Sequence, residues 1–145
     1  MQTLFCVRTL GVADAEQALE LYSELTYGPA CRDPSAFLAV LAHPGTRIFG
    51  ADSAGLILGM VTLHILPNVT WDARPYALIE NVVTRADRRG KGIGRKVMQT
   101  AIDAAWASDA YKIMLMTGQR RGAAGFYEAM GFSSEDKQAM VMRSA

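Results

Sequence analysis

The residues best suited to chemistry form a short basic, glycine-rich segment: Arg88-Arg89-Gly90-Lys91-Gly92-Ile93-Gly94-Arg95-Lys96. Residues 77–84 just before it are apolar and β-branched, as in a strand, and the residues after it have helical spacing. A strand, a glycine turn and a helix start together present bare backbone N–H groups to an anion, and the helix dipole adds partial positive charge. We therefore predict a phosphate or pyrophosphate site at residues 88–96, called the glycine turn below.

Three glycine signatures compete for this segment. A P-loop needs serine or threonine after its glycine-lysine pair, but Lys91 is followed by Gly92, which excludes that pattern. A dinucleotide fingerprint needs a third glycine where Val97 stands, so that pattern is weak. The pattern that remains is Arg89-x-x-Gly92-x-Gly94, placed directly after a strand that ends in Val-Val-Thr.

Composition limits the classes of function. With 145 residues, half of them hydrophobic, the chain is most simply one domain covering residues 1–145. A net charge of +1 and a basic segment without interleaved aromatic residues argue against a nucleic-acid partner or a membrane surface. The chain has two cysteines and two histidines, all isolated in sequence, so we expect no metal site. Cysteines without a pairing motif, and no apolar run approaching ~18 residues, favour a cytoplasmic protein.

Local patterns predict the elements that position the glycine turn. We expect strands over residues 4–9, 46–51, 56–66, 76–84, 111–116 and 138–143, and helices over residues 14–26, 34–43, 93–106 and 123–130. Asp14 is expected to cap the first helix. Residues 67–75 should form a long polar loop with an exposed Trp71.

This order of elements predicts an α+β fold with a mixed, mostly antiparallel central sheet and flanking helices. Residues 46–51 and 56–66 should form an antiparallel hairpin. The helix over residues 93–106 should make a crossover between parallel strands at 76–84 and 111–116. Ligands bind beyond the carboxyl ends of parallel strands, which is where the glycine turn lies.

Three segments of the chain resemble the GCN5-related N-acetyltransferase (GNAT) superfamily. They are residues 79–83 (Ile-Glu-Asn-Val-Val), the glycine turn, and residues 125–132 (Gly-Phe-Tyr-Glu-Ala-Met-Gly-Phe), which are similar to the family's FYxxxGF signature. One predicted helix and one predicted strand separate the last two, which makes the combination specific. Residues 111–143 look most like glucosamine-phosphate N-acetyltransferases and unassigned small-amine acetyltransferases.

The resemblance implies the acetyltransferase fold, with a splayed parallel strand pair, and acetyl-CoA as cosubstrate without a metal. Backbone N–H groups of the glycine turn would hold the coenzyme A pyrophosphate, and the preceding strand would pair with the pantetheine amides. One strand N–H would polarise the thioester carbonyl. The cofactor-binding residues implied are Val82, Val83, Thr84, Arg89, Gly90, Lys91, Gly92, Ile93, Gly94 and Arg95.

Tyr127 matches the family's general acid, which protonates the departing thiolate. A phenol has a pKa of about 10 and a thiol one of about 8.5, so the hydroxyl can hold and deliver a proton at neutral pH. The alternative is that Tyr127 is a packing residue. Glu80 interrupts an apolar strand, and the resemblance implies a general base acting through water. The alternative for Glu80 is a structural carboxylate bonded to a neighbouring loop.

One position departs from the family pattern. The family often has an asparagine that contacts the cofactor seven residues before this tyrosine, and here Arg120 stands there. Arg120 and Arg121 could bind an anionic acceptor or a cofactor phosphate, or could be solvated loop charges. His64 is expected to be a hydrogen-bonded or surface histidine rather than a catalytic one.

The reaction implied is direct attack of a small-molecule primary amine, such as that of an amino sugar, on acetyl-CoA in a ternary complex. The alternatives are a protein or peptide N-acetyltransferase, and a non-catalytic acyl-CoA-binding sensor of the same fold. Acceptor contacts are expected from residues 21–35, 66–75 and the C-terminal strand. Small members of the family often bury that strand between subunits, which implies a homodimer.

Overall fold

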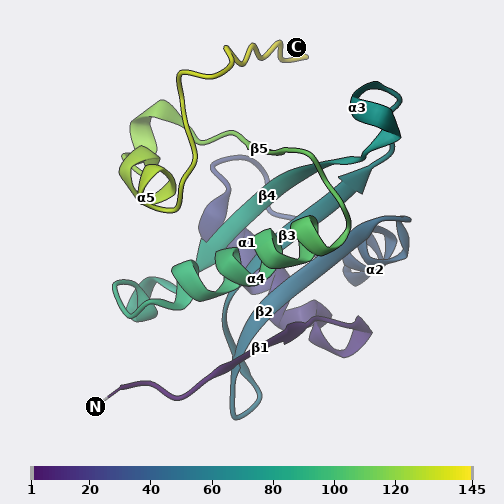
Figure 1. Cartoon of the computed structure of the whole chain (residues 1–145). Helices are drawn as coiled ribbons and strands as arrows, with labels where there is room; N and C mark the ends of the chain where they lie inside the picture. Colours follow the sequence, from purple (N-terminus) through teal and green to yellow (C-terminus); the bar gives the residue numbers. More distant parts are fainter. Residues whose placement is uncertain (1, 145) are drawn as a thin grey trace. The chain divides into compact units, whose positions relative to one another are not determined.

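The computed structural model describes residues 2–144 (Figure 1). Its elements are β1 (Cys6–Thr9), η1 (Val12–Asp14), α1 (Ala15–Leu25), α2 (Pro34–Ala42), β2 (Thr46–Ser53), β3 (Leu56–Leu66), α3 (Thr70–Ala73), β4 (Tyr76–Thr84), η2 (Ala86–Arg88), α4 (Ile93–Ala107), β5 (Ile113–Leu115), η3 (Gln119–Arg121) and α5 (Ala124–Ala129). The contacts divide the chain into two compact units, Met1–Met114 and Leu115–Ala145, and each is described by itself.

A five-stranded sheet with the order β1-β2-β3-β4-β5 forms the framework. The first four strands are antiparallel neighbours. β5 follows the α4 crossover and lies parallel to β4, where the N–H of Ala77 donates to the carbonyl of Lys112 at 3.0 Å. The prediction of a mixed, mostly antiparallel sheet with one parallel pair is confirmed.

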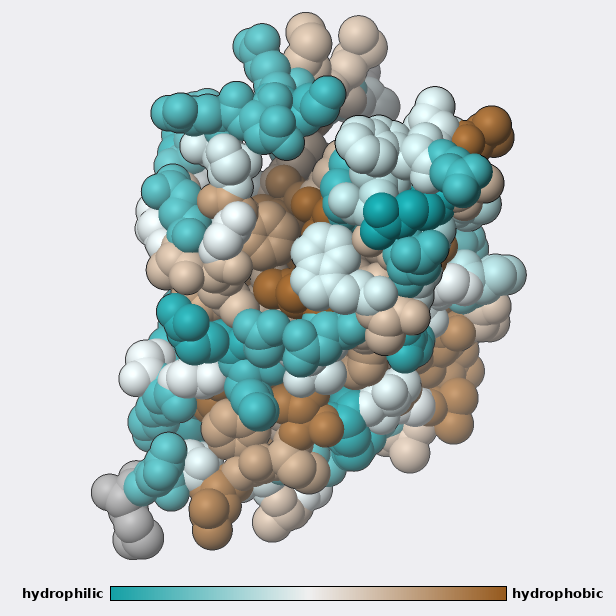
Figure 2. All heavy atoms as spheres, in the orientation of Figure 1, coloured by the Kyte–Doolittle hydropathy of each residue, from teal (hydrophilic) through white to brown (hydrophobic). Residues whose placement is uncertain are grey.

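Helices cover both faces of this sheet, α1 and α2 on one and α4 on the other (Figure 1). The first face buries a cluster that includes Leu21, Phe37, Ile48 and Met60. On the other face α4 is amphipathic: its buried residues are Ile93, Val97, Met98, Ala101, Ile102 and Ala105. Figure 2 shows hydrophilic and hydrophobic side chains interspersed on the side of the molecule that carries α4.

Asp14 stands at the start of α1 but its side chain does not cap the helix, so that prediction is wrong. Its carboxylate accepts hydrogen bonds from Nη1 and Nη2 of Arg8, at 2.9 and 2.8 Å, and from the N–H of Gly11. Arg8 also donates to Asp52 on β2. The bidentate, charge-assisted bonds from Arg8 occupy the Asp14 carboxylate in place of the α1 cap, and they tie β1, η1 and β2 together.

The predicted strand over residues 138–143 is wrong, because the described residues after α5 contain no strand. A strand forms only where its backbone groups pair with those of a neighbouring strand. Its apolar side chains are open to solvent: Met140 is 89% exposed and Met142 is 98% exposed. β5 is also shorter than the expected residues 111–116.

The loop over residues 67–75 contains the short turn α3, whose residues Trp71, Asp72 and Ala73 have φ values of 55°, 56° and 58°. Such left-handed backbone is costly for residues other than glycine. Trp71 is exposed, as expected, and its ring stacks on that of Tyr111 at a centroid distance of 5.1 Å.

Two further findings concern the described residues alone. No group of three or more histidine, cysteine and acidic side chains in residues 2–144 is arranged to hold a metal ion. None of the helices in this range is both long enough and apolar enough to cross a membrane.

Candidate active site

The glycine turn is open at the start of α4. Gly90 and Gly92 have φ values of 75° and 81°, and a Cβ added to either would meet no atom within 4 Å. At the start of α4, the first N–H that donates to a carbonyl one turn earlier is that of Lys96, which bonds to the carbonyl of Gly92 at 3.1 Å. The N–H groups of the first helical turn therefore have no helical acceptor. A fitting anion would find free donors and space here.

The structure separates the basic residues near the turn into two groups. Arg85 is structural: its Nε donates to the carbonyl of Ile57 at 2.6 Å and its guanidinium pairs with Glu20 of α1. Arg88 forms an ion pair with Asp87, with 3.5 Å between Nε and Oδ2. The exposed basic residues of the glycine turn are Arg89, Lys91, Arg95 and Lys96. The positive charge available to a ligand is therefore concentrated on residues 89–96.

Close packing at Gly59 of β3 positions this turn. A Cβ on Gly59 would lie 2.9 Å from the carbonyl oxygen of Val83 and 3.0 Å from Cγ2 of Ile93. The missing side chain thus lets β3 approach both the end of β4 and the first residue of α4. The turn is held from both ends by the sheet.

A β-bulge interrupts β4 just before the turn. The register shifts between Met60 and Thr62 of β3, where Asn81 and Val82 of β4 face a single residue. Asn81 has a φ of 52°, a conformation that asparagine tolerates better than most residues. A bulge leaves a backbone group unpaired and bends the strand. Sequence reasoning missed it, although an asparagine inside an apolar strand was a signal.

Glu80 lies on the face of β4 that α1 and α2 cover. It is half-buried and pairs across the sheet with Thr62. Thr62 is hydrogen-bonded to Tyr22 of α1, whose pKa is raised by burial. His64 lies on the same face of β3, two residues after Thr62. It is therefore a diagonal neighbour of Glu80, at about 7–8 Å between Cα atoms. Polar side chains from α1, β3 and β4 thus share this face.

Two histidines meet on one hydroxyl beside this group. The Oγ1 of buried Thr46 lies 2.7 Å from Nδ1 of His64 and 3.0 Å from Nδ1 of His43. Thr46 and His64 are direct partners in the β2–β3 ladder, and His43 ends α2. No pattern in the sequence indicates this cluster, because strand register and a helix end bring the three residues together.

Tyr127 belongs to the second unit, whereas the glycine turn belongs to the first. Its ring contacts those of Phe126 and Phe132 at centroid distances of 5.1 and 6.2 Å. Burial raises the pKa of its hydroxyl, and the charge of Arg121 acts in the opposite direction. Arg120, at the position where the resemblance expects asparagine, is exposed in η3.

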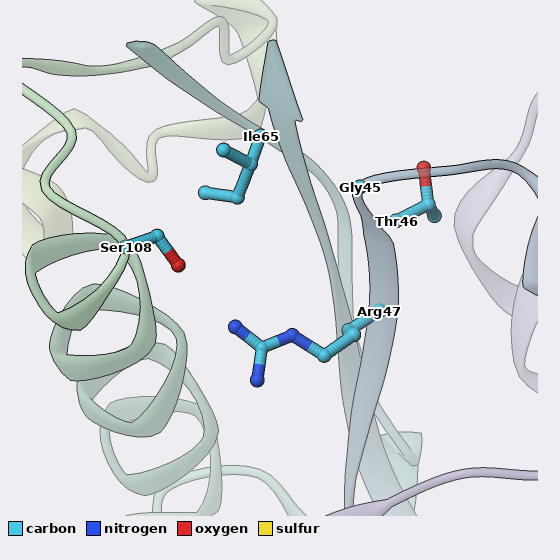
Figure 3. Close-up of a pocket in the computed structure, with 5 residues that line it drawn as sticks. All are labelled: Gly45, Thr46, Arg47, Ile65 and Ser108. Carbon is cyan, nitrogen blue, oxygen red and sulfur yellow. The ribbon is translucent and has the colours of Figure 1, made fainter. Parts of the chain in front are cut away.

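A hollow lies at the opposite end of α4 from the glycine turn (Figure 3). It has a volume of about 390 Å³ and is lined by Gly45, Thr46, Arg47, Ile65 and Ser108. The 15 residues of α4 separate it from the turn by about 22 Å. Arg47 extends towards the hollow from β2, and Ser108 lines it from the C-terminal end of α4 (Figure 3). We therefore treat it as distinct from the candidate active site.

Comparison with known proteins found one family model, described as the acetyltransferase (GNAT) family, that matches residues 13–132. Glucosamine 6-phosphate N-acetyltransferase of Trypanosoma brucei brucei is 28% identical over 136 residues, with 91% of each chain covered. N-alpha-acetyltransferase RimI of Mycobacterium tuberculosis is 26% identical over 121 residues, covering 83% of this chain and 73% of that one. The structure of a putative acetyltransferase from Agrobacterium tumefaciens str. C58 superposes with a TM-score of 0.90 at 41% identity, covering 96% of this chain and 99% of the other.

Proposed function

Because the chain belongs to the acetyltransferase (GNAT) family, whose cosubstrate is acetyl-CoA, we propose that it acetylates a primary amine of a small molecule such as an amino sugar. The protein is an acyltransferase. The observation that carries the proposal is the open glycine turn, which offers unpaired N–H groups and exposed basic residues directly after a bulged strand.

The residues around the turn fit the phosphates of coenzyme A. The positive φ of Gly90 and Gly92 and the open space beside them admit a pyrophosphate against the backbone of residues 89–95. Arg89, Lys91 and Arg95 would supply the neutralising charge. The backbone of Val82, Val83 and Thr84 beyond the bulge would pair with the pantetheine amides. When bound, acetyl-CoA supplies an activated acetyl group.

Two side chains are proposed to move protons. Glu80 would accept a proton, directly or through water, as the amine nitrogen attacks the acetyl carbon. Tyr127 would donate its hydroxyl proton to the departing sulfur, and burial keeps that hydroxyl protonated at neutral pH. A backbone N–H beside the bulge would stabilise negative charge on the carbonyl oxygen. Amine attack and thiol departure then need no acyl-enzyme.

The acceptor class is supported by the glucosamine 6-phosphate N-acetyltransferase that this chain resembles. Arg32 and Arg120 are exposed and remain candidates for a phosphate, as does Arg74, whose guanidinium pairs with Asp109. Similarity to RimI favours a second candidate, acetylation of a peptide N-terminus.

A comparison of acceptors tests this assignment. We expect kcat/KM for glucosamine 6-phosphate to exceed that for peptides beginning with alanine by at least tenfold, with thiol release as the measurement. A reversed preference would favour the peptide acetyltransferase. Release of thiol with neither class, while acetyl-CoA still binds, would favour a sensor without turnover.

A further inference from the structure

The cluster of His43, Thr46 and His64 is not used by the proposed mechanism above. One hydroxyl group of Thr46 lies within hydrogen-bond distance of two Nδ1 atoms, at 3.0 Å and 2.7 Å. The two imidazole rings are edge to face, 6.3 Å apart. Thr46 is buried, His64 is half-buried and His43 is exposed. The group therefore connects a covered face of the sheet with solvent.

The chemistry of a hydroxyl restricts the protonation of both rings. A threonine hydroxyl has one proton to donate, and it accepts through its lone pairs. When both contacts are hydrogen bonds and both rings are neutral, at most one Nδ1 can be bare, because the hydroxyl has a single proton to give. The arrangement that uses this proton has one Nδ1 protonated and donating, and the other bare and accepting. The hydrogen bond at Nδ1 fixes which nitrogen of each ring is free. If His64 is the donor, its Nε2 is left with a free lone pair.

The surroundings of His64 suit a proton acceptor. The groups that face it are His43 from the end of α2, the neutral Thr46 from β2 and Glu80 from β4, with Tyr22 of α1 bonded to the adjacent Thr62. Its Nδ1 faces β2, and β4 with Glu80 lies on the other side of β3. Burial, and then the charge of His43, lower the pKa of His64, so the ring is neutral at pH 7.

The proposed reaction leaves a proton that has no acceptor so far. A primary amine arrives at pH 7 mostly as the ammonium ion, because amine pKa values lie well above 7. Forming an amide removes two protons from this nitrogen. Glu80 takes the one released as nitrogen attacks, and Tyr127 returns one proton to sulfur. The first deprotonation, which exposes the nitrogen lone pair, needs a second acceptor.

We propose that His64 is this acceptor: its Nε2 removes the first proton from the bound ammonium, while Thr46 and His43 hold the ring in the required tautomer. The N–H bond of the ammonium breaks, its electron pair stays on nitrogen, and a neutral imidazole becomes imidazolium. After product release the imidazolium and the protonated Glu80 give up their protons and the Tyr127 phenolate regains one, so that each turnover releases one proton to water. Glu80 stabilises both the ammonium and the imidazolium by charge. This inference rests on the proposed function and adds His64 to its catalytic residues.

The dependence of kcat/KM on pH tests the role of His64. In the wild type, kcat/KM for the preferred amine should reach a plateau above the lowered pKa of His64, since the enzyme itself deprotonates the acceptor. His64→Gln should lower kcat/KM at pH 7 by about 100-fold. Its kcat/KM should then rise about tenfold per pH unit towards the pKa of the amine, because only the free amine reacts. Added imidazole should restore part of the activity of His64→Ala.

Matched threonine variants test the positioning role. Thr46→Val removes the hydroxyl at nearly constant volume and should lower kcat/KM about tenfold, whereas Thr46→Ser should remain near wild type. Thr100→Val is the control, because the Thr100 hydroxyl bonds only to the carbonyl of Lys96 in its own helix. Equal activity of Thr46→Val and Thr100→Val would overturn the positioning role.

A measurement without substrate separates this inference from the proposed function. The ¹⁵N shifts of the wild-type imidazole rings should show His64 protonated at Nδ1 and His43 at Nε2, and this difference should vanish in Thr46→Val. The opposite tautomers would overturn the inference even if the enzyme acetylates amines. An unchanged pH profile in His64→Gln would do the same. Absence of acetyl transfer to any amine by the wild type would contradict the proposed function and, with it, the role of His64.

Discussion

At the scale of single residues, protonation follows from surroundings that differ sharply between Tyr127 and Asp14. The Tyr127 hydroxyl is half-buried beside Phe126 and Phe132, and burial favours its neutral form, so its pKa lies above the usual value of 10. The Asp14 carboxylate accepts two hydrogen bonds from Arg8, which hold its pKa below the usual range. Tyr127 is therefore suited to donate a proton at neutral pH, and Asp14 is suited to remain charged.

The first prediction concerns Tyr127→Phe. Loss of the hydroxyl should lower kcat by about 100-fold or more with little change in acetyl-CoA affinity, since a positioned acid contributes in that range. In the wild type any alkaline decline in kcat from ionisation of Tyr127 should lie above pH 10, and the variant should lack it. Phe126→Leu, which alters a neighbouring ring, is the control. Unchanged turnover in Tyr127→Phe would leave it as a packing residue.

The second prediction concerns stability and pH at Asp14. Because the pKa of Asp14 is lowered by folding, its ionised form stabilises the protein above the ordinary carboxyl pKa, and that contribution is lost as the pH falls through the folded pKa. Asp14→Asn should reduce the free energy of unfolding at pH 7 by about 1–3 kcal/mol. The difference from wild type should shrink below about pH 4.

Urea unfolding at pH 7 and pH 3 measures this difference. Asp103→Asn on the exposed face of α4 is the control and should be nearly neutral at both pH values. A penalty for Asp14→Asn that is the same at pH 3 and pH 7 would show that the charge of Asp14 is not what stabilises the junction of β1, η1 and β2.

At the scale of elements, the strand, bulge and glycine turn act as one unit. β4 ends against Gly59 of β3, and the first residue of α4 packs on the same glycine. The bulge at Asn81 frees backbone groups on the strand, and the turn frees those of the helix start. The backbone groups of the bulged strand and those of the helix start therefore follow one another along the chain. An extended ligand with a phosphate at one end could bind to both.

The third prediction concerns Gly92. Gly92→Glu should lower acetyl-CoA affinity by at least 100-fold in calorimetry, because a side chain and a negative charge would occupy the proposed pyrophosphate position. Gly92→Ala is the matched control: the position has space for a Cβ, and the positive φ costs about 1 kcal/mol of stability. Equal affinity in wild type and Gly92→Glu would refute the site.

Local sequence could predict the elements whose structure is decided locally. The apolar run of β4, the glycine turn and the amphipathic α4 were all predicted within one or two residues of their observed limits. The bulge in β4 was not predicted, because it depends on the register of β4 against β3. The contact between His43, Thr46 and His64 was not predicted either, because strand register brings Thr46 next to His64, which is 18 residues away in sequence. Asp14 was misjudged because a distant partner, Arg8, competes for its side chain.

At the scale of the whole molecule, the described residues after α5 carry exposed apolar side chains. Met140, Val141 and Met142 are 89%, 62% and 98% exposed. These residues were predicted to form a strand, and a strand cannot form without a paired backbone. We propose that a second copy of the chain provides that partner, which would make the protein a homodimer.

The fourth prediction tests the dimer. Size-exclusion chromatography with light scattering should give twice the chain mass for the wild type and a monomer for the double variant Met140→Asp and Met142→Asp. Val12→Asp changes an equally apolar residue that is 70% exposed in η1, and should leave the mass unchanged. A monomeric wild type at micromolar concentration would contradict the dimer.

The measurement that most directly tests the account is amine-dependent release of thiol from acetyl-CoA by the purified wild type, followed across amino sugars, polyamines, amino acids and peptides, with Gly92→Glu in parallel. We expect turnover with a small-molecule amine, strongest among the amino sugars, one N-acetylated product per thiol released, and loss of turnover in Gly92→Glu. Thiol release that does not depend on an amine, or turnover that survives in Gly92→Glu, would contradict it.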